Sequence, residues 1–239
     1  MSAVLNVAAY LFVPLENLDV LRESLLASLQ AQGVRGTILL APEGINLFLA
    51  GEAEAVERFL AELRADPRLS ALVEKRSWSA AVPFKRTRVK IKREIVPLGK
   101  HNLHPSEHPA PYLSAARLKA WIASGRAFVL LDTRNRFEYQ MGSFSSAVDL
   151  GIDDFRAFPD AIAARLAEWQ DQPIVTFCTG GIRCEKAAPL MRSLGFKEVY
   201  QLEGGILRYF EDEGGTHYRG HCFVFDDRVA LNPSLDAVT

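Results

Sequence analysis

The sequence predicts an α/β protein with two domains, and three observations support this prediction. First, two apolar runs at residues 129–132 and 174–177 read as buried strands that end in polar residues, which is typical of a parallel sheet flanked by helices. Second, residues 1–80 alternate strand and helix patterns in an order that completes a separate α+β unit. Third, a segment rich in proline and histidine separates the two. With 239 residues and 49% hydrophobic side chains, the chain is long enough to bury two modest cores.

We expect the amino-terminal domain, residues 1–98, to have an α+β ferredoxin-like fold. The patterns are, in order, a strand within 5–15, a helix within 19–33, two strands within 37–51, a helix within 52–69 and a strand within 74–80. Pro42-Glu43-Gly44 is a turn signal between the two central strands, and Pro67 ends the second helix. This order is typical of a ferredoxin-like sandwich. We favour it over an extension of the carboxyl-terminal sheet, because its elements already bury one another.

Positive charge gathers at the end of this domain, although the net charge of the chain is only −1. Residues 75–100 contain nine basic residues and one acidic residue. The alternation predicts a strand with Arg86, Arg88, Lys90 and Lys92 on one face and Lys85, Val89, Ile91 and Arg93 on the other. A basic strand suits a polyanion such as RNA, because neutralised phosphates release counterions. The alternative is a solvated edge strand whose charges prevent aggregation. The RNA-binding candidates are Lys85, Arg86, Arg88, Lys90, Lys92 and Arg93.

Residues 99–111 are predicted to be a linker, because His101–Pro111 has no periodic apolar positions. Its three histidines fit a solvated segment better than a metal site. The carboxyl-terminal domain, residues 112–239, then begins with a helix that Ser114 caps.

Residues 174–184, IVTFCTGGIRC, are the most informative stretch of the chain. The strand places Cys178 at the carboxyl end of the sheet, where open α/β folds place ligands. Gly180 and Gly181 let the next amides turn toward the sulfur, since they carry no side chain. Those amides, the helix that follows and Arg183 all favour a thiolate over a thiol. Cys178 is therefore the predicted nucleophile; the alternative is a small apolar residue at a strand end.

Cys184 follows the loop and lies on the first turn of the predicted helix. It is either a redox partner that forms a reversible disulfide with Cys178 or a helix residue that packs on the sheet. Glu185 and Lys186 are expected to be solvated. Pro189 is expected to kink the helix or to mark a later first turn.

Two further segments are predicted to surround the loop. Asp132 ends one strand and is followed by Arg134 and Glu138, for which we favour a buried ion-pair network at the sheet edge over catalysis. Gly204 and Gly205 follow another strand and are expected to shape the rim of the pocket.

Composition argues against several classes of protein. Three cysteines are too few and too unevenly spaced for a secreted disulfide framework, so we expect a reducing cytoplasm. There is no metal-ligand spacing, and no flavin or haem motif is evident. The apolar run from Val7 to Leu15 has no basic residue before it and is too short to cross a bilayer. No membrane attachment and no protein partner are expected.

Five phrases, CTGGIRC, DTRNRFEYQMGSF, LEGGIL, CFVFDDRVA and APEGIN, resemble the tRNA uridine(34) hydroxylase family, a rhodanese-like group, over residues 5–232. The resemblance implies a rhodanese-like domain after a ferredoxin-like, or acylphosphatase-like, domain. It also implies oxygen-dependent hydroxylation of the wobble uridine to 5-hydroxyuridine, with the anticodon arm of tRNA as partner and molecular oxygen as co-substrate. The essential cysteine of the family falls on Cys178, and its loop on Thr179, Gly180, Gly181, Ile182 and Arg183. Residues 142–147 depart from the usual rhodanese Gly-His-Ile-x-Gly-Ala.

Two other functions stay open at this point. A rhodanese sulfurtransferase would carry a persulfide on Cys178 and would act without RNA. A non-catalytic tRNA-binding module would use the basic strand alone, and replacement of Cys178 would then change nothing. For the hydroxylase itself, the thiolate either attacks C6 of the pyrimidine or carries oxygen as an oxidised sulfur or persulfide.

Overall fold

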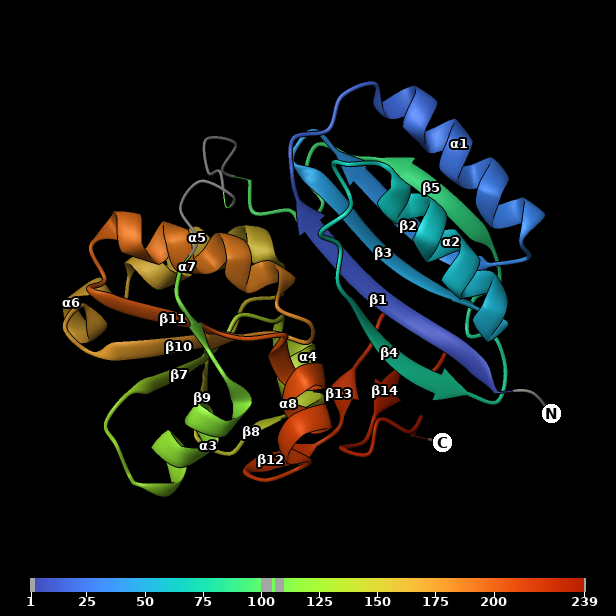
Figure 1. Cartoon of the computed structure of the whole chain (residues 1–239). Helices are drawn as coiled ribbons and strands as arrows, with labels where there is room; N and C mark the ends of the chain where they lie inside the picture. Colours follow the sequence, from blue (N-terminus) through green and yellow to red (C-terminus); the bar gives the residue numbers. More distant parts are fainter. Residues whose placement is uncertain (1–2, 100–104, 106–109, 239) are drawn as a thin grey trace. The chain divides into compact units, whose positions relative to one another are not determined.

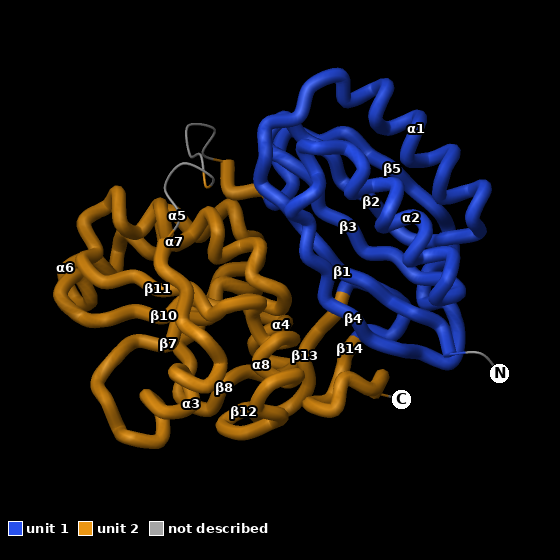
Figure 2. The backbone as a smooth tube through the Cα atoms, viewed as in Figure 1, with its two compact units in different colours: residues 1–96, 225–229, 239 blue, residues 97–224, 230–238 orange. Residues whose placement is uncertain are grey.

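The computed structural model describes residues 3–99, 105 and 110–238, which form two compact units (Figures 1 and 2). Unit 1 contains residues 1–96 together with 225–229 and 239; unit 2 contains residues 97–224 and 230–238. The predicted division followed sequence order, whereas in the structure Phe225–Val229 group with unit 1. Most of the predicted linker 99–111 lies outside the described residues.

Unit 1 is an α+β sandwich built on one five-stranded sheet. Its elements are β1 (Val4–Phe12), α1 (Leu18–Ala31), β2 (Arg35–Ala41), β3 (Gly44–Gly51), α2 (Ala53–Ala65), β4 (Glu74–Ser79) and β5 (Thr87–Ile91). The strand order is β4-β1-β3-β2-β5, in which β5 runs parallel to β2 and the other pairs are antiparallel. The predicted ferredoxin-like order is confirmed, with β5 added at one edge.

Both helices cover one face of this sheet (Figure 1). The strands alternate, so that Val7, Ile38 and Leu47 point into the core and are at most 3% exposed. Leu29 of α1 and Phe59 of α2 are completely buried against them. Each element therefore buries an apolar face against the others, as the patterns predicted.

The basic strand is shorter than the alternation predicted. Only Arg88 and Lys90 of the predicted face lie within β5, because its pairing partner β2 spans only Arg35–Ala41. Single backbone hydrogen bonds extend the pairing, from Gly36 N to Arg86 O at 3.3 Å and from Lys92 N to Leu40 O at 2.8 Å. Val89 packs against the core on the opposite face. All six candidate basic residues, Lys85, Arg86, Arg88, Lys90, Lys92 and Arg93, are exposed.

Unit 2 has a five-stranded parallel sheet in the order β6-β11-β10-β7-β9. Its strands and helices are β6 (Tyr112–Leu113), α3 (Ala115–Ala123), β7 (Val129–Asp132), α4 (Arg136–Met141), β8 (Gly142–Phe144), β9 (Ala147–Asp149), a 3₁₀ turn (Phe155–Ala157), α5 (Phe158–Ala163), α6 (Leu166–Trp169), β10 (Pro173–Phe177), α7 (Ile182–Leu194), β11 (Glu198–Leu202), α8 (Gly205–Glu213), β12 (Tyr218–Gly220), β13 (Cys222–Phe223) and β14 (Ala230–Leu231). Helices α5 and α7 pack together on one face of the sheet, and α3 and α8 on the other (Figure 1). The predicted parallel sheet flanked by helices is confirmed, and its central strand is β10.

Helix α7 is buried along most of its length. It packs against β10, β11 and α5, so the expectation that Glu185 and Lys186 are solvated was wrong: they are 8% and 1% exposed. Glu185 accepts hydrogen bonds from the Tyr112 hydroxyl at 2.9 Å and from Gln201 Nε2 at 3.2 Å, which offset the cost of burying its charge. The helix runs without a break through Pro189. Within the part of the chain that the structure describes, no helix is long and apolar enough to span a membrane.

Candidate active site

Cys178 directly follows the central strand β10, at the carboxyl end of the parallel sheet. The Gly181 amide donates a hydrogen bond to Cys178 Sγ at 3.1 Å. Gly181 has a φ of +100°, a conformation that residues with a side chain rarely adopt. This glycine therefore allows the loop to turn its amide toward the sulfur.

Several groups act on the ionisation of Cys178. Burial is the largest effect and raises its pKa, because the residue is only 1% exposed. A hydrogen bond from the Cys184 thiol, the positive charge of Arg183 and the amides of Arg183 and Gly181 act in the opposite direction. Together they lower the pKa of Cys178 from 9.0 to about 6. The loop therefore holds a thiolate at neutral pH.

Cys184 is also buried, and its pKa shifts in the opposite direction. Burial, the hydrogen bond to Cys178 and the negative charge of Cys178 raise its pKa well above the ordinary value. The Thr133 hydroxyl lies 3.7 Å from its sulfur. Both cysteines are free thiols in the structure. The interaction between the two cysteines thus lowers the pKa of Cys178 and raises that of Cys184.

The Arg183 side chain is held by Glu138 of α4. Arg183 Nη1 donates to Glu138 Oε1 at 3.2 Å, and Nη2 donates to Oε2 at 2.8 Å, so the pair is bidentate. The Glu138 side chain is completely buried, and the Arg183 side chain is 9% exposed. The Asn135 amide also donates to Glu138 at 3.1 Å. This pair fixes the guanidinium beside the loop while its charge still lowers the pKa of Cys178.

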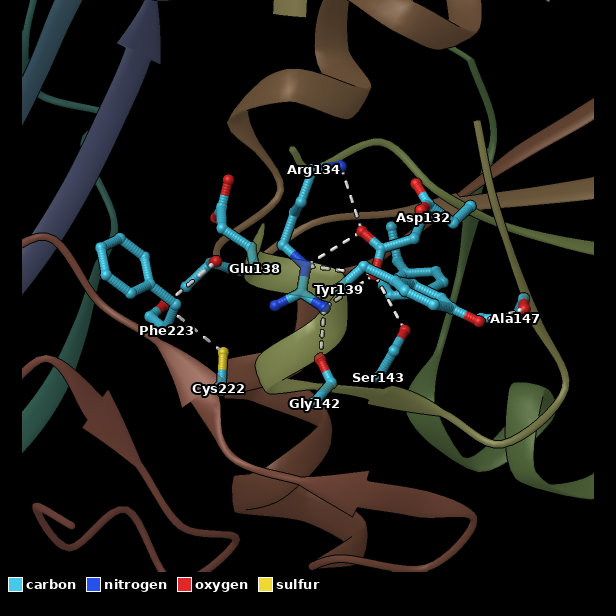
Figure 3. A network of polar contacts seen from close by, with 12 residues as sticks. Asp132, Arg134, Glu138, Tyr139, Gly142, Ser143, Ala147, Cys222 and Phe223 are labelled. Atoms are coloured by element: carbon cyan, nitrogen blue, oxygen red, sulfur yellow. Dashed lines mark hydrogen bonds and ion pairs between the residues drawn. The ribbon is translucent and has the colours of Figure 1, made fainter. Parts of the chain in front are cut away.

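Asp132, Arg134 and Glu138 form buried ion pairs as predicted, but in two separate pairs, because Glu138 binds Arg183 and not Arg134. Figure 3 shows the second pair, in which Arg134 Nη2 lies 2.7 Å from Asp132 Oδ2 and donates to the Gly142 carbonyl at 2.6 Å. Ser143 Oγ donates to the same carboxylate at 2.8 Å. Asp132 and Arg134 have completely buried side chains. This network ties the end of β7 to β8, and so supports the sheet edge next to the loop.

Helix α8 approaches the Cys178 loop closely from the other side. The amides of Ile206 and Leu207 donate to the carbonyls of Cys178 and Thr179, each at 3.0 Å. A methyl group on Gly205 would overlap the Cys178 carbonyl oxygen and would lie 2.8 Å from Gly181 N. Gly205 is therefore required by the close packing of helix and loop, as its predicted position beside the site suggested.

The remaining loop residues form the outer edge of the site. Thr179 is 8% exposed, and its hydroxyl lies 3.4 Å from the Phe223 carbonyl, to which it donates. Gly180 and Ile182 are the two partly exposed loop residues. Among the described residues, no group of three or more histidine, cysteine or acidic side chains is arranged to hold a metal ion.

The structure places the predicted residues in two groups. Cys178, its loop and Cys184 lie together in unit 2, whereas the six basic candidates lie in unit 1. Sequence reasoning did not identify Glu138 as the partner of Arg183, because the two residues are 45 positions apart and no local pattern links them. It also did not foresee that Cys184 lowers the pKa of Cys178.

Comparison with known proteins agrees with this architecture. Residues 4–95 match the family model of the UPF0176 acylphosphatase-like domain, and residues 114–212 match that of the rhodanese-like domain. A rhodanese-like domain from Anabaena sp. with 25% sequence identity covers 46% of this chain and 79% of its own, with a TM-score of 0.39.

Relatives similar over the whole chain carry one name. The tRNA uridine(34) hydroxylase of Variovorax paradoxus is 54% identical over 99% of this chain and 92% of its own length. That of Bordetella avium is 52% identical over 99% of this chain and 100% of its own length. The chain therefore belongs to the tRNA uridine(34) hydroxylase family.

Proposed function

We propose that this protein is a tRNA-modifying oxidoreductase that hydroxylates the uridine at position 34 of tRNA to 5-hydroxyuridine in the cytoplasm, with Cys178 as the catalytic residue. The observation that carries the proposal is the loop around Cys178: Cys178 Sγ accepts a hydrogen bond from the Gly181 amide at 3.1 Å, and the surrounding groups lower its pKa to about 6. Relatives that are more than half identical are named for this reaction. A sulfur ionised at neutral pH is the form that reacts as a nucleophile.

The thiolate is suited to activate a pyrimidine at C5. Attack of Cys178 Sγ on C6 of the uracil ring forms a carbon–sulfur bond and moves the electrons of the C5–C6 double bond toward C5 and O4. C5 then reacts with the oxidant. Loss of the C5 proton and release of the thiolate restore the double bond, so Cys178 returns unchanged. We favour this route over oxygen transfer from an oxidised sulfur, because it uses the thiolate form directly.

Molecular oxygen is the proposed co-substrate. The net reaction places one oxygen atom at C5 and reduces the other to water, which consumes two electrons and two protons from a reductant. The base, extruded from its stack in the anticodon loop, reaches the sulfur past Gly180 and Ile182, because these are the loop residues with exposed surface. The bound RNA then covers this path and keeps water from the reacting atoms.

The basic residues of unit 1 are the proposed surface for the tRNA backbone. Lys85, Arg86, Arg88, Lys90, Lys92 and Arg93 are all exposed within a nine-residue stretch. Among the described residues, none of these side chains forms an ion pair within 4 Å with an acidic group. Their charges are therefore available for phosphates, and each phosphate contact adds salt-dependent affinity.

Cys184 is the proposed redox partner of Cys178. Its thiol interacts with the Cys178 thiolate, so loss of two electrons and one proton from the pair to a mild oxidant such as a disulfide reagent joins the two sulfurs. Peptide mapping after such treatment should recover a Cys178–Cys184 crosslink. Recovery of mixed disulfides alone would contradict this role.

Nucleoside mass spectrometry of tRNA tests the proposed reaction. A strain that lacks the gene and any redundant enzyme is complemented with the wild type, with C178S or with C222S. Cys222 is also buried, but burial raises its pKa to about 12, so it serves as the control for replacement of a buried cysteine. Wild type and C222S should restore 5-hydroxyuridine derivatives, and C178S should not. Equal restoration by C178S would contradict a catalytic role for Cys178.

The rhodanese-like domain supports sulfur transfer as a second candidate function. In that reaction Cys178 accepts a sulfane sulfur from a donor such as thiosulfate and passes it to an acceptor thiol or cyanide. Intact-protein mass measurement after incubation with thiosulfate separates the two functions. A stable persulfide that turns over on cyanide without RNA, together with unchanged 5-hydroxyuridine in the deletion strain, would favour the sulfurtransferase.

A further inference from the structure

Phe137 is an exposed aromatic residue on the short helix that holds Arg183. Its side chain is 47% exposed, which leaves a large apolar surface in water next to a polar site. It follows Arg136 and precedes Glu138, the residue that grips the Arg183 guanidinium. An aromatic ring exposed at this position is accessible to a ligand that approaches the site.

Three other side chains of α4 make contacts within unit 2. Glu138 pairs with Arg183, Tyr139 Oη donates to the Ala147 carbonyl at 3.1 Å, and Arg136 binds the Gly151 carbonyl. These contacts fix the helix in place. Phe137 is thus presented on a rigid support, so ordering it on binding costs little conformational entropy.

Phe223 links the Phe137 ring to the Cys178 loop. The two ring centroids are 5.1 Å apart at an interplanar angle of 84°, an edge-to-face pair. The Phe223 carbonyl accepts the hydrogen bond from Thr179, the residue after Cys178. Thus the backbone of Phe223 is bound to loop residue Thr179, and Phe137 directly precedes Glu138, the partner of loop residue Arg183. Although it pairs with Phe223, the Phe137 side chain stays 47% exposed.

We infer that the Phe137–Phe223 pair is a stacking platform for a nucleobase at the entrance to the Cys178 site. The ligand is an unpaired pyrimidine, the wobble uridine, and this inference rests on the proposed function. Enzymes that act on a flipped base hold it between aromatic or apolar side chains, and aromatic rings stack on unpaired RNA bases. A base stacked on Phe137 is held beside the loop whose thiolate attacks its ring.

The test uses the full-length protein and an anticodon stem-loop RNA with a fluorescent uridine analogue at position 34. Stacking on an aromatic ring quenches the fluorescence of this analogue. The variants are F137L and F137Y. Leucine preserves apolar bulk at this half-exposed position but has no ring, whereas tyrosine preserves the ring. F225L is the matched control, because Phe225 is 49% exposed and also pairs with another ring, that of Phe48.

Wild type, F137Y and F225L should quench the analogue, and F137L should not. Stacking of one base contributes about 1–3 kcal/mol, so F137L should bind the stem-loop roughly 5- to 150-fold more weakly. The thiolate titration of Cys178 should be the same in F137L and wild type, because a stacking role does not act through Arg183. Quenching and affinity in F137L equal to those of the wild type would overturn the inference, as would equal loss in F225L.

Failure of the inference and failure of the proposed function give different results. If wild type restores 5-hydroxyuridine in cells but F137L quenches normally, the platform is wrong and the reaction stands. If wild type does not restore 5-hydroxyuridine, the proposed reaction is wrong, whatever the fluorescence shows.

Discussion

At the scale of single residues, the properties of Cys178 come from its neighbours. Burial alone raises the pKa of a thiol, so a buried cysteine is ordinarily neutral and inert. Here the Cys184 thiol, the Arg183 charge and two amides outweigh burial and lower the pKa to about 6. Cys222 shows the contrasting case in the same unit: burial, only partly offset by Arg134, raises its pKa to about 12. The difference lies in the loop amides and the second thiol.

Removal of the Cys184 hydrogen bond should raise the pKa of Cys178. C184A removes the donor, whereas C184S keeps a hydroxyl that can replace it. The midpoint of Cys178 ionisation should therefore move upward in C184A and much less in C184S, measured by the rate of alkylation against pH in a C222S background. An unchanged midpoint in C184A would show that the second thiol does not stabilise the thiolate.

The lowered pKa also makes stability depend on pH. Because the folded-state pKa of about 6 lies below the ordinary 9.0, ionisation of Cys178 stabilises the folded state. This contribution is complete above the ordinary value and is lost as pH falls through about 6. The difference in free energy of unfolding between wild type and C178S should therefore grow between these pH values, measured by urea unfolding. A difference that does not change with pH would argue against an ionised Cys178.

At the scale of secondary-structure elements, the loop is held by the elements on either side of it. β10 delivers Cys178, α7 begins with the amides that face the sulfur, and α4 holds Arg183 through Glu138. Helix α8 closes the other side through the hydrogen bonds of Ile206 and Leu207. A change in one of these supports should therefore alter the reactivity of the sulfur as well as the stability of the domain.

Replacement of Gly205 by alanine tests the packing of α8 on the loop. Gly205 and Gly125 have the same φ of +66°, but a methyl group on Gly125 meets nothing within 4 Å. G125A should lower the free energy of unfolding by about 1–2 kcal/mol, because alanine adopts the left-handed backbone conformation at a cost. G205A should lower the free energy of unfolding, measured with urea, by more than G125A does. Because the methyl group displaces the loop, G205A should also slow alkylation of Cys178 or raise the pKa of the Cys178 thiol. Equal behaviour of the two variants would show that this close approach does not support the loop.

At the scale of the whole molecule, the two units carry complementary chemistry. Unit 2 contains the thiolate, and unit 1 contains the cluster of exposed basic residues on and around β5. The charges of the whole chain nearly cancel, with a net charge of −1, so the basic cluster is a local feature and not a property of overall composition. Local positive potential attracts a polyanion even when the net charge is near zero.

Charge reversal of the basic cluster should weaken tRNA binding in a salt-dependent way. In K90E/K92E, the dependence of log affinity on log salt should become shallower by about 0.9 for each phosphate that the variant no longer neutralises. K197E/K119E is the matched control, because it reverses two partly or largely exposed lysines of unit 2. Filter binding with purified tRNA over a series of salt concentrations measures the affinity of each variant and its salt dependence. The same slope for K90E/K92E and wild type would exclude this cluster as the RNA surface.

Sequence predicted the parts of the structure that depend on local patterns. The order of strands and helices along unit 1 follows from the apolar periodicity of each segment, and the turn of Gly181 toward Cys178 follows from the glycine pair in the loop after the strand. Contacts distant in sequence were missed, such as the pairing of Glu138 with Arg183. The burial of Glu185 was also missed. A charged residue suggests exposure, and the sequence does not show that α5, β10 and β11 pack around α7.

The ultraviolet absorbance of the thiolate tests the central claim most directly, because it reports ionisation without requiring a reagent to reach a buried sulfur. Wild type and C178S are titrated side by side, and their difference isolates Cys178, since Cys184 and Cys222 have raised pKa values. The difference should show one thiolate that forms as pH rises through about 6. A difference that appears only near 9, the ordinary pKa of a thiol, would contradict the account.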